Sequence, residues 1–248
     1  MFSRFFRATP TPLLVFSAVA FGASLFAVRF PNVPGASAGS YVSSALISAP
    51  AFVALIAHLG ARRATLSVLA VSAFAYAIES VGVATGFPYG PFYYGDALGP
   101  KLFGLVPYLL PVTYVPLVIG AVAVASQALD RPAARVLLAA LLLVMMDGVL
   151  DPGATALGFW TWTEGGPYYG VPLTNFAGWL LSGAVSAALL LVTSRPLAPL
   201  PPGALDSAIL SLAFWTGATA LSGLALPALL GLILLAAFLA QRSRAVSK

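Results

Sequence analysis

Three acidic residues lie where apolar segments end, and their types and spacing indicate acid–base chemistry. The chain has only seven Asp and Glu residues among 248. Glu79, Asp147 and Asp151 lie near the ends of two apolar stretches. Acidic groups in such places are energetically costly, so their presence indicates a function. A desolvated carboxylic acid can donate a proton, and a second carboxylate can accept one from water. We therefore predict these three residues as catalytic.

Asp147 and Asp151 are four residues apart, so on a continuous helix they share one face. Like charges in an apolar setting do not both ionise readily, so we expect one of the two to hold a proton. The alternative for Asp151 is that it only ends the helix, because Pro152 disfavours helical geometry at the residue before it. The alternative for Glu79 is an interfacial anchor with its carboxylate in water.

Each acidic stretch is followed by a loop rich in Gly, Pro and aromatic residues. Gly86 lies seven residues after Glu79, and Gly158 lies seven residues after Asp151. The loops then run GPFYYG over 90–95 and GPYYG over 166–170. This pattern predicts two parallel internal repeats that face one cavity. We place the functional core at 75–185 within a single integral membrane domain, 1–248.

The aromatic loop residues are predicted to bind substrate. Rings held on Gly- and Pro-rich turns suit a long, planar, apolar ligand or a cationic intermediate, although Tyr and Trp also gather at membrane interfaces whatever the function. An Asn near the start of the next span could orient water. The predicted substrate-binding residues are Tyr76, Phe87, Tyr89, Tyr93, Tyr94, Trp160, Trp162, Tyr168, Tyr169, Asn175 and Trp179. Asp96 and Glu164 are secondary candidates, for which a solvated loop position is the simpler explanation.

The elements that position these residues are predicted to be membrane helices. Hydrophobic residues make up 60% of the chain and charged residues 8%, whereas a soluble domain has about 25% charged residues. A span needs roughly 20 apolar residues. The sequence predicts an all-α polytopic membrane helix bundle of about eight spans, or seven if the last two are one. The expected spans lie near 11–30, 42–60, 64–84, 105–127, 133–151, 173–193, 206–222 and 225–241.

Basic residues are distributed unevenly between the two ends of these spans. If the N-terminus is inside, the outer segments hold only Arg29 and Lys101. This bias predicts cytoplasmic termini, acidic and aromatic loops on the outer face, and a multi-pass protein of the cell (plasma) membrane, with no nucleic-acid partner. A cleaved signal peptide ending at Ala36-Ser37-Ala38 is the alternative for the first span. The inner basic residues are Arg4, Arg7, Arg62, Arg63, Arg131, Arg135, Arg195, Arg242, Arg244 and Lys248.

The residue types that are missing exclude several membrane chemistries. The chain has no Cys and one His, so thiolate-ligated metals and histidine-rich di-iron sites are excluded. A retinal Schiff base needs a lysine within a span, and the two lysines are Lys101 and Lys248. Prenyl transfer needs a second acidic motif. We therefore expect no metal and no cofactor, and either acid–base chemistry or transport.

Three blocks of sequence resemble the membrane carotenoid-biosynthesis family of CruF-type 1,2-hydratases, which includes the bisanhydrobacterioruberin hydratases. The blocks are ESVGVATGFPYGPFYYGDALGPKLFGLVP, DGVLDPGATALGFWTW and GGPYYGVPLTNFAGWLLSG. The resemblance implies a hydro-lyase that adds water across the terminal 1,2 double bond of an acyclic carotenoid. It implies a membrane-dissolved substrate of γ-carotene, lycopene or bacterioruberin-precursor type, in the lipid bilayer, with other carotenoid enzymes as further candidate partners.

The roles within the predicted site follow from this chemistry. Protonation at C2 gives a tertiary cation at C1, which water captures. Asp147 and Glu79 are the best candidates for the acid and the water-activating base, with Asp151 tuning the pair, and the sequence leaves open which is which. A non-catalytic carotenoid or lipid carrier, or a pathway scaffold, is the alternative. A proton-coupled transporter that uses Asp147 and Asp151 is a third possibility.

Overall fold

The prediction of an all-α bundle with eight spans is confirmed. The computed structural model describes residues 11–30, 35–195 and 199–246. Within these residues, eight helices are long and apolar enough to cross a membrane, so the chain is a multi-pass membrane protein. The helices are α2 (Thr11–Arg29), α3 (Ala36–Leu59), α4 (Ala61–Thr85), α5 (Leu110–Ala128), α6 (Pro132–Ala156), α7 (Leu173–Thr193), α8 (Asp206–Leu221) and α9 (Ala225–Val246).

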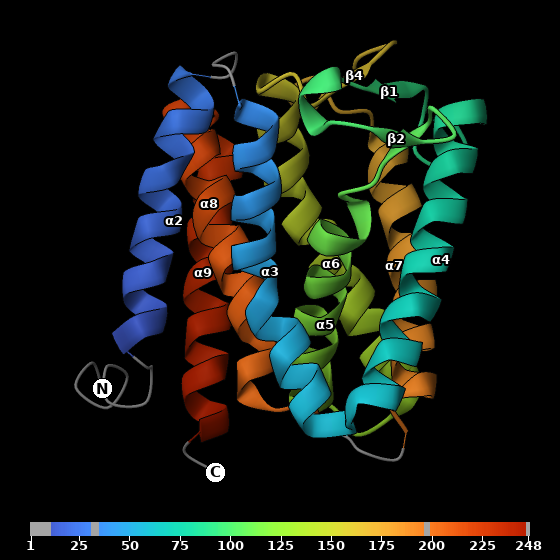
Figure 1. The fold of residues 1–248 in the computed structure, drawn as a ribbon, viewed down its shortest axis with the longest axis vertical. Helices are drawn as coiled ribbons and strands as arrows, with labels where there is room; N and C mark the ends of the chain where they lie inside the picture. Colours follow the sequence, from blue (N-terminus) through green and yellow to red (C-terminus); the bar gives the residue numbers. More distant parts are fainter. Residues whose placement is uncertain (1–10, 31–34, 196–198, 247–248) are drawn as a thin grey trace.

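Helices α5 and α6 lie in the middle of the bundle (Figure 1). Helices α4 and α7 pack on one side of them, and α2, α3, α8 and α9 lie on the other side. Most residues of α5 are buried, including the run from Tyr114 to Ala123. Helices α2, α3 and α4 instead expose many large apolar side chains, such as Phe16, Leu46 and Leu69. Because lipid can cover such residues, the exposed faces agree with a membrane location.

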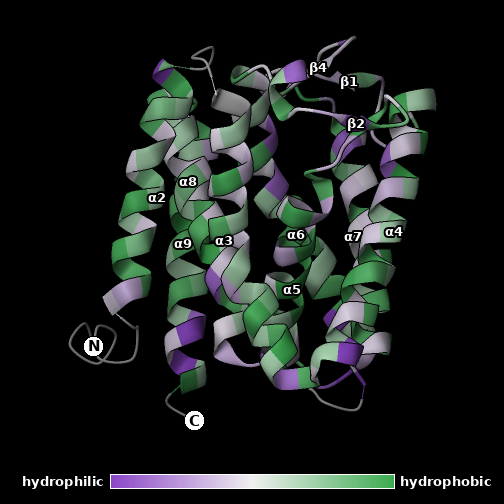
Figure 2. Ribbon diagram, in the orientation of Figure 1, coloured by the Kyte–Doolittle hydropathy of each residue, from purple (hydrophilic) through white to green (hydrophobic). Residues whose placement is uncertain are grey.

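Charged residues gather at the ends of the helices, and the apolar residues lie between them (Figure 2). The described chain begins and ends at one end of the bundle, which we call the terminal end, and the strands lie at the other, the loop end. Of the described basic residues, only Arg29 and Lys101 lie at the loop end. Arg4, Arg7 and Lys248 are outside the described residues. The other basic residues, at the terminal end, are Arg62, Arg63, Arg131, Arg135, Arg195, Arg242 and Arg244.

Helix α6 does not end at Asp151 but continues through Pro152 to Ala156. Proline has no N–H, so the carbonyl of Gly148, four residues earlier, loses its helical partner. The hydroxyl of Tyr168 donates to that carbonyl oxygen at 3.0 Å. In the same way, Ser48 donates to the carbonyl of Val112, four residues before Pro116. Side chains from other segments thus satisfy the carbonyls that proline leaves unpaired, and Asp151 stays within a continuous helix.

The two Gly- and Pro-rich loops meet at the loop end. Strand β1 (Phe92–Tyr94) pairs antiparallel with β4 (Trp160–Trp162), and Tyr94 lies opposite Trp160. Gly86 and Gly158 both have positive φ, 81° and 70°, directly after α4 and near the end of α6. This conformation favours glycine, so the glycines matched in the sequence have equivalent local roles. The short elements that remain are η1 (Asp96–Leu98), β2 (Lys101–Leu102), β3 (Val106–Pro107) and η2 (Pro202–Leu205).

Strands β2 and β3 form a small hairpin, in which Leu102 pairs with Val106. The predicted fourth span, 105–127, therefore begins later than expected, at Leu110. Apolar character alone extended the prediction into this hairpin, because Leu, Val and Pro at its end are as apolar as the helix that follows. The hairpin and η1 lie above the space between α3 and α4 in Figure 1.

Candidate active site

Asp147 and Asp151 lie side by side on α6 and are joined by Asn175. Asp147 is 0% exposed, Asp151 3% and Asn175 1%. The Asn175 side-chain amide, in the first turn of α7, donates to Asp147 Oδ2 at 2.7 Å and to Asp151 Oδ2 at 2.5 Å. A single NH₂ group has two hydrogens, so both are used. The expected common face of the two aspartates is present, and the amide that we expected to orient water bonds the two carboxyl groups.

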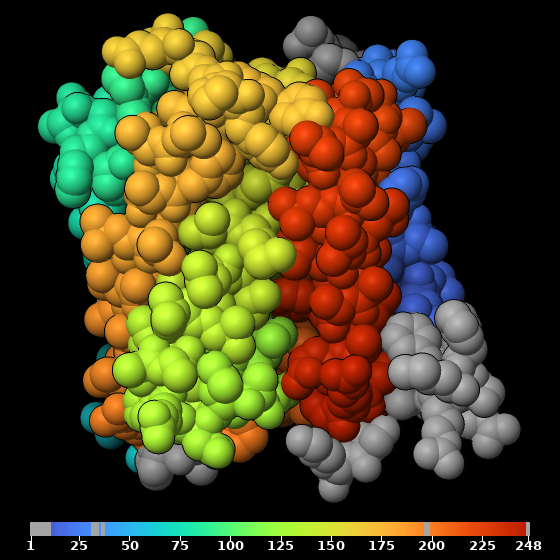
Figure 3. Space-filling view, turned by 180° about the vertical axis from the view of Figure 1, so that it is seen from behind, coloured from blue at the N-terminus to red at the C-terminus, as the bar shows by residue number. Residues whose placement is uncertain are grey.

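The second oxygens of the two aspartates have different surroundings. Trp160 Nε1 donates to Asp151 Oδ1 at 2.5 Å. Asp147 Oδ1 is buried, and no group of the described residues forms a hydrogen bond with it. Seen from behind, the first half of α6 lies at the surface, whereas the loop after α6 and the start of α7 cover its second half (Figure 3). The pair therefore lies inside the protein, covered by its own following loop.

Glu79 is joined to this pair through two aromatic side chains. Tyr94 OH donates to Glu79 Oε2 at 2.8 Å. The ring of Tyr94 packs edge-on against Trp160, with centroids 5.8 Å apart, and Trp160 bonds Asp151. Glu79 is partly buried, unlike the two aspartates. The structure thus links all three predicted catalytic residues in one network across the paired strands, in which Glu79 is the least buried of the three.

A compact aromatic cluster covers the network at the loop end. Phe92 is at its centre, with ring centroids 4.9 Å from Trp162, 5.4 Å from Tyr94 and 6.2 Å from Tyr89. Phe92, Trp162 and Tyr89 are buried, and partly buried Trp179 packs against this cluster and against the main core. Most of these rings contact each other, so hydrophobic packing explains their positions. Their predicted contact with substrate stays a prediction.

Tyr89 enters the bundle between α4 and α7 because both helices have a glycine at that level. A Cβ on Gly82 would lie 2.8 Å from the Tyr89 ring, and a Cβ on Gly178 would touch the other edge of the ring even more closely. Thr174 also donates to the Tyr89 carbonyl at 2.9 Å. The small residues on these helix faces therefore let a loop side chain reach the level of the acidic groups.

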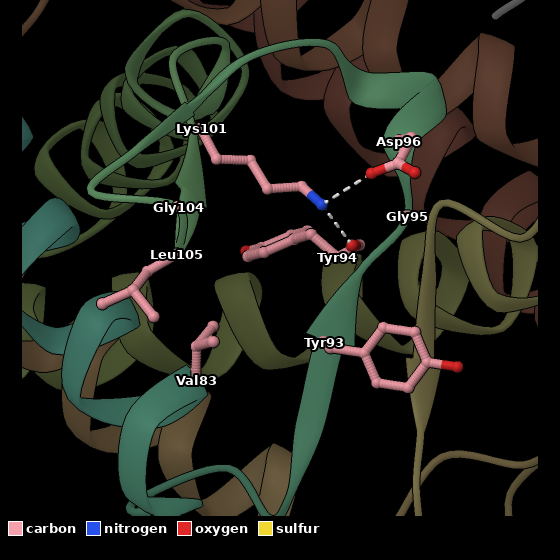
Figure 4. A pocket seen from close by; sticks show the side chains of 8 residues that line it. All are labelled: Val83, Tyr93, Tyr94, Gly95, Asp96, Lys101, Gly104 and Leu105. Carbon is pink, nitrogen blue, oxygen red and sulfur yellow. Dashed lines mark hydrogen bonds and ion pairs between the residues drawn. The ribbon is translucent and has the colours of Figure 1, made fainter.

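An open pocket of about 330 Å³ lies beside Tyr94 at the loop end. Lys101 Nζ donates to the Tyr94 carbonyl at 2.7 Å and forms an ion pair with Asp96 at 3.1 Å (Figure 4). The pocket contacts the network at Tyr94, the residue that bonds Glu79, and neither aspartate of the pair lines it. Its lining residues are Val83, Tyr93, Tyr94, Gly95, Asp96, Lys101, Gly104 and Leu105.

Several predicted residues lie at the edge of the site. Phe87 is 61% exposed, and Glu164 and Asp96 are exposed in loops, as their solvated explanation expects. Tyr169 is partly exposed and accepts a hydrogen bond from the Leu226 amide. The other edge residues are Tyr76, which donates to the Tyr108 carbonyl, and Tyr168, which supports α6 at Gly148.

Tyr114 on α5 is not among the residues predicted from the sequence. It is buried, its ring packs against Trp179 with centroids 5.6 Å apart, and its hydroxyl is 2.8 Å from Ser186 Oγ on α7. The hydroxyl of Ser182, one turn away on α7, is buried without a hydrogen-bond partner. A Tyr within an expected membrane span is a signal that the sequence contains. Tyr114 lies outside both predicted repeats, from which the site residues were predicted.

Burial keeps Tyr94 and Tyr89 in their protonated, donating form, because it raises the pKa of each phenol. Burial raises the pKa of Tyr94 well above its usual range, and the nearby Glu79 carboxylate raises it further. The pKa of Tyr89 is raised for the same two reasons, in the same order. A phenol with a raised pKa stays a hydrogen-bond donor at alkaline pH. Tyr94 is therefore suited to donate to Glu79 over a wide pH range.

The described residues contain no group of three His, Cys, Asp or Glu side chains placed to hold a metal ion. The three acidic residues of the network are held by an amide, an indole and a phenol instead. Such donors orient carboxyl groups for hydrogen bonding and proton transfer. The arrangement can therefore hold the carboxyl groups in fixed positions for proton transfer.

Comparisons with known proteins show the family of this chain. A family model described as carotenoid biosynthesis protein matches residues 39–238. The chain belongs to the carotenoid biosynthesis protein family. The matched region contains the acidic network, the two paired loops and the helices that carry them. The resemblance noted in the sequence is thereby confirmed at the level of this family.

A bisanhydrobacterioruberin hydratase of Haloarcula japonica is 50% identical to the chain over 141 residues. The match covers 55% of this chain and 48% of that protein, so the chain aligns with about half the length of this relative. No solved structure matches the chain.

Proposed function

We propose that this family member is a carotenoid 1,2-hydratase, a hydro-lyase that adds water across the terminal 1,2 double bond of an acyclic carotenoid end group. The observation that carries the proposal is the buried pair Asp147 and Asp151, joined by Asn175 and connected to Glu79 through Tyr94 and Trp160. Buried carboxyl groups inside a membrane bundle are expensive and mark function. The hydratase of Haloarcula japonica supports the choice of reaction.

The proposed reaction uses carboxyl groups alone. One carboxylic acid gives its proton to C2, and the π electrons form the new C–H bond and leave a tertiary cation at C1. The oxygen of water bonds C1, and a carboxylate takes the proton that the water loses. Aromatic faces and the negative charge of the network stabilise the cation. The product is a 1-hydroxy carotenoid, and no redox cofactor takes part.

The substrate in this proposal is a carotenoid dissolved in the bilayer, of γ-carotene, lycopene or bacterioruberin-precursor type. The pocket beside Tyr94, at about 330 Å³, is at the lower end of the size of ligand sites. It has room for water and a small group, not for a whole polyene. We assign it to the supply of water, because Lys101 and Asp96 make its rim polar, and we assign the polyene to the apolar surface of the bundle. Other carotenoid enzymes are further candidate partners.

We also propose that the loop end faces outward at the cell membrane. The support is the basic residues, which lie mostly at the terminal end. The chain has no cysteine, so Glu164→Cys and Asp130→Cys give two exposed single thiols at opposite ends. A membrane-impermeant maleimide added to intact cells should label Glu164→Cys and not Asp130→Cys. The reverse result would invert the proposed orientation.

The function is tested in a host that makes lycopene or γ-carotene. Expression of the chain should give a product heavier by one water, and an Asp147→Asn variant present at equal level in the membrane should not. Carotenoid that copurifies with the protein unchanged, without any hydrated product, would support a carrier instead. Substrate-dependent proton flux in vesicles would support a transporter.

A further inference from the structure

The two aspartates of the buried pair do not have equal hydrogen-bond partners. Asp151 accepts one bond at each oxygen, from Trp160 Nε1 and from the Asn175 amide. Asp147 accepts from Asn175 at one oxygen, and its Oδ1 is buried with no hydrogen-bond partner in the part of the chain that the structure describes. Both donors to Asp151 are N–H groups that cannot accept a proton. Asp151 is therefore surrounded as an ionised carboxylate is, whereas Asp147 is not.

The unpartnered oxygen decides where a proton costs least. If Asp147 were ionised, a charged oxygen would be buried without a donor, and burying an uncompensated charge is far more costly than burying an unpaired neutral hydroxyl. If Asp151 were protonated, two charge-assisted hydrogen bonds would become weaker neutral ones. Both comparisons favour a proton on Asp147 Oδ1 and a negative charge on Asp151.

The orientation of Asn175 agrees with a single proton. With its NH₂ group toward the pair, Asn175 can bond two unprotonated oxygens, and the pair needs no proton at either Oδ2. Turned round, its carbonyl oxygen would face both Oδ2 atoms and would require a proton on each. The observed arrangement thus leaves Oδ1 of Asp147 as the one oxygen of the pair that no donor occupies.

We propose that Asn175 and Trp160 are positioning residues that keep Asp151 ionised and confine the proton of the pair to Oδ1 of Asp147. In the proposed hydratase reaction Asp147 is then the acid, and this role rests on the proposed function. Its O–H bond breaks, its electrons stay on Asp147, and the π electrons of the alkene form the C2–H bond. Glu79 takes the proton of the water that bonds C1, and net return of one proton from Glu79 to Asp147 restores the site.

The protonation state can be measured without substrate. Infrared difference spectra of the purified full chain in lipid, in H₂O and D₂O, show the carbonyl stretch of a protonated buried carboxylic acid apart from carboxylate bands. Labelling with ¹³C-carboxyl aspartate should shift this band, which separates Asp147 from Glu79. Asp147→Asn should lose the band, and Asp151→Asn should keep it. A band that survives Asp147→Asn, that is lost equally in both variants, or that ¹³C-aspartate does not shift would overturn the proposal.

The two tryptophans of β4 provide a milder variant and its matched control. Trp160→Phe removes the donor to Asp151 Oδ1, so part of the proton should move to Asp151 and the band should split or weaken. Trp162, two residues away in the same strand, is buried with its Nε1 unpartnered, so Trp162→Phe should leave the band as in the wild type. An unchanged band in folded Trp160→Phe protein would contradict the assigned role of Trp160, even if Asp147→Asn does not fold.

These spectra also separate this inference from the proposed function. If the chain gives no hydrated carotenoid but the band follows Asp147, the reaction is wrong and the proton assignment stands. If hydration occurs but the band follows Asp151 or Glu79, the reaction stands and the assignment of the acid is wrong.

Discussion

The chain has two acid-bearing units, each made of a helix and the loop that follows it. In each unit an aromatic side chain of a strand donates a hydrogen bond to a carboxyl group of the helix, but the two carboxyl groups lie in different environments. In the first unit Glu79 on α4 accepts a hydrogen bond from Tyr94 of β1, and in the second Asp151 on α6 accepts one from Trp160 of β4. Tyr94 and Trp160 face each other across the strand pair. Glu79, however, is partly exposed near an open pocket, whereas the Asp151 side is buried and holds a second acid, Asp147.

In the proposed mechanism, this difference gives the two carboxyl groups opposite tasks. A carboxylate near water can take up and release protons, whereas a carboxylic acid sealed from water keeps its proton until a reactive partner arrives. The number of donors around each group and its access to water set the task, more than the residue type does. We therefore expect substitutions in the buried unit, which contains Asp147 and Asp151, to lower turnover more than substitutions at Glu79.

Asp147→Asn should cause the largest loss of hydrated product among these variants. Removal of a positioned general acid typically costs about 10²–10⁴-fold in rate, so hydrated product should fall by at least about 100-fold at equal protein level. The product is measured by mass in membranes that contain the acyclic carotenoid. Asp130→Asn, an exposed substitution at the terminal end, is the control. A yield in Asp147→Asn equal to that control would remove Asp147 from the reaction.

Glu79→Ala should reduce turnover less than loss of Asp147, and small carboxylates should restore part of it. Acetate can reach the first unit through the open pocket beside Tyr94 and replace the missing base, whereas the buried position of Asp147 in the second unit should exclude it. Turnover is measured with and without acetate in Glu79→Ala and Asp147→Ala. Rescue of Asp147→Ala but not of Glu79→Ala would show that Asp147, and not Glu79, is the carboxyl group that small molecules can reach.

Tyr94→Phe should have a moderate effect through Glu79. It removes a hydrogen bond to a charged group, worth about 1.5–3 kcal/mol, and a loss of 1.4 kcal/mol corresponds to about tenfold in rate. We expect turnover to fall by about 10- to 100-fold, with a changed pH profile because Glu79 loses its donor. Tyr108→Phe, at a half-exposed tyrosine, is the matched control. A pH profile identical to wild type in Tyr94→Phe would show that this hydrogen bond has no part in the reaction.

Tyr168→Phe should mainly lower stability and is expected to have the smallest effect on chemistry. The Gly148 carbonyl would lose its donor within α6, and an unsatisfied buried group costs about 1–3 kcal/mol. Thermal unfolding in detergent should occur at a lower temperature than in wild type or in the control variant Tyr169→Phe. The Tyr169 hydroxyl accepts one exposed hydrogen bond, from the Leu226 amide at 3.3 Å. A loss of turnover at unchanged stability would show instead that Tyr168 contacts substrate.

Much of the architecture could be predicted from the sequence because the signals are local. Runs of apolar residues gave eight spans, and the four-residue spacing of Asp147 and Asp151 gave a shared face. Hydropathy and helical periodicity depend on neighbours within one turn or one span, so no tertiary contact is needed to detect them.

The end of α6 shows where local rules fail. The sequence offered Pro152 as a reason to stop the helix at Asp151, and the helix continues because Tyr168, twenty residues away in the chain from Gly148, supplies the missing hydrogen bond. The motif match between 90–95 and 166–170 likewise did not predict which strands pair, since β1 pairs with 160–162.

The sequence alone determined which acids are present and near which end of the bundle they lie. Only the tertiary structure decided their states, because the groups that distinguish them come from other segments. Packing of α7 on α6 brings Asn175 between the aspartates, and pairing of β4 with β1 sets Trp160 beside Tyr94. A carboxyl group's charge depends on its donors and its burial, and neither can be read from the residues next to it in the chain.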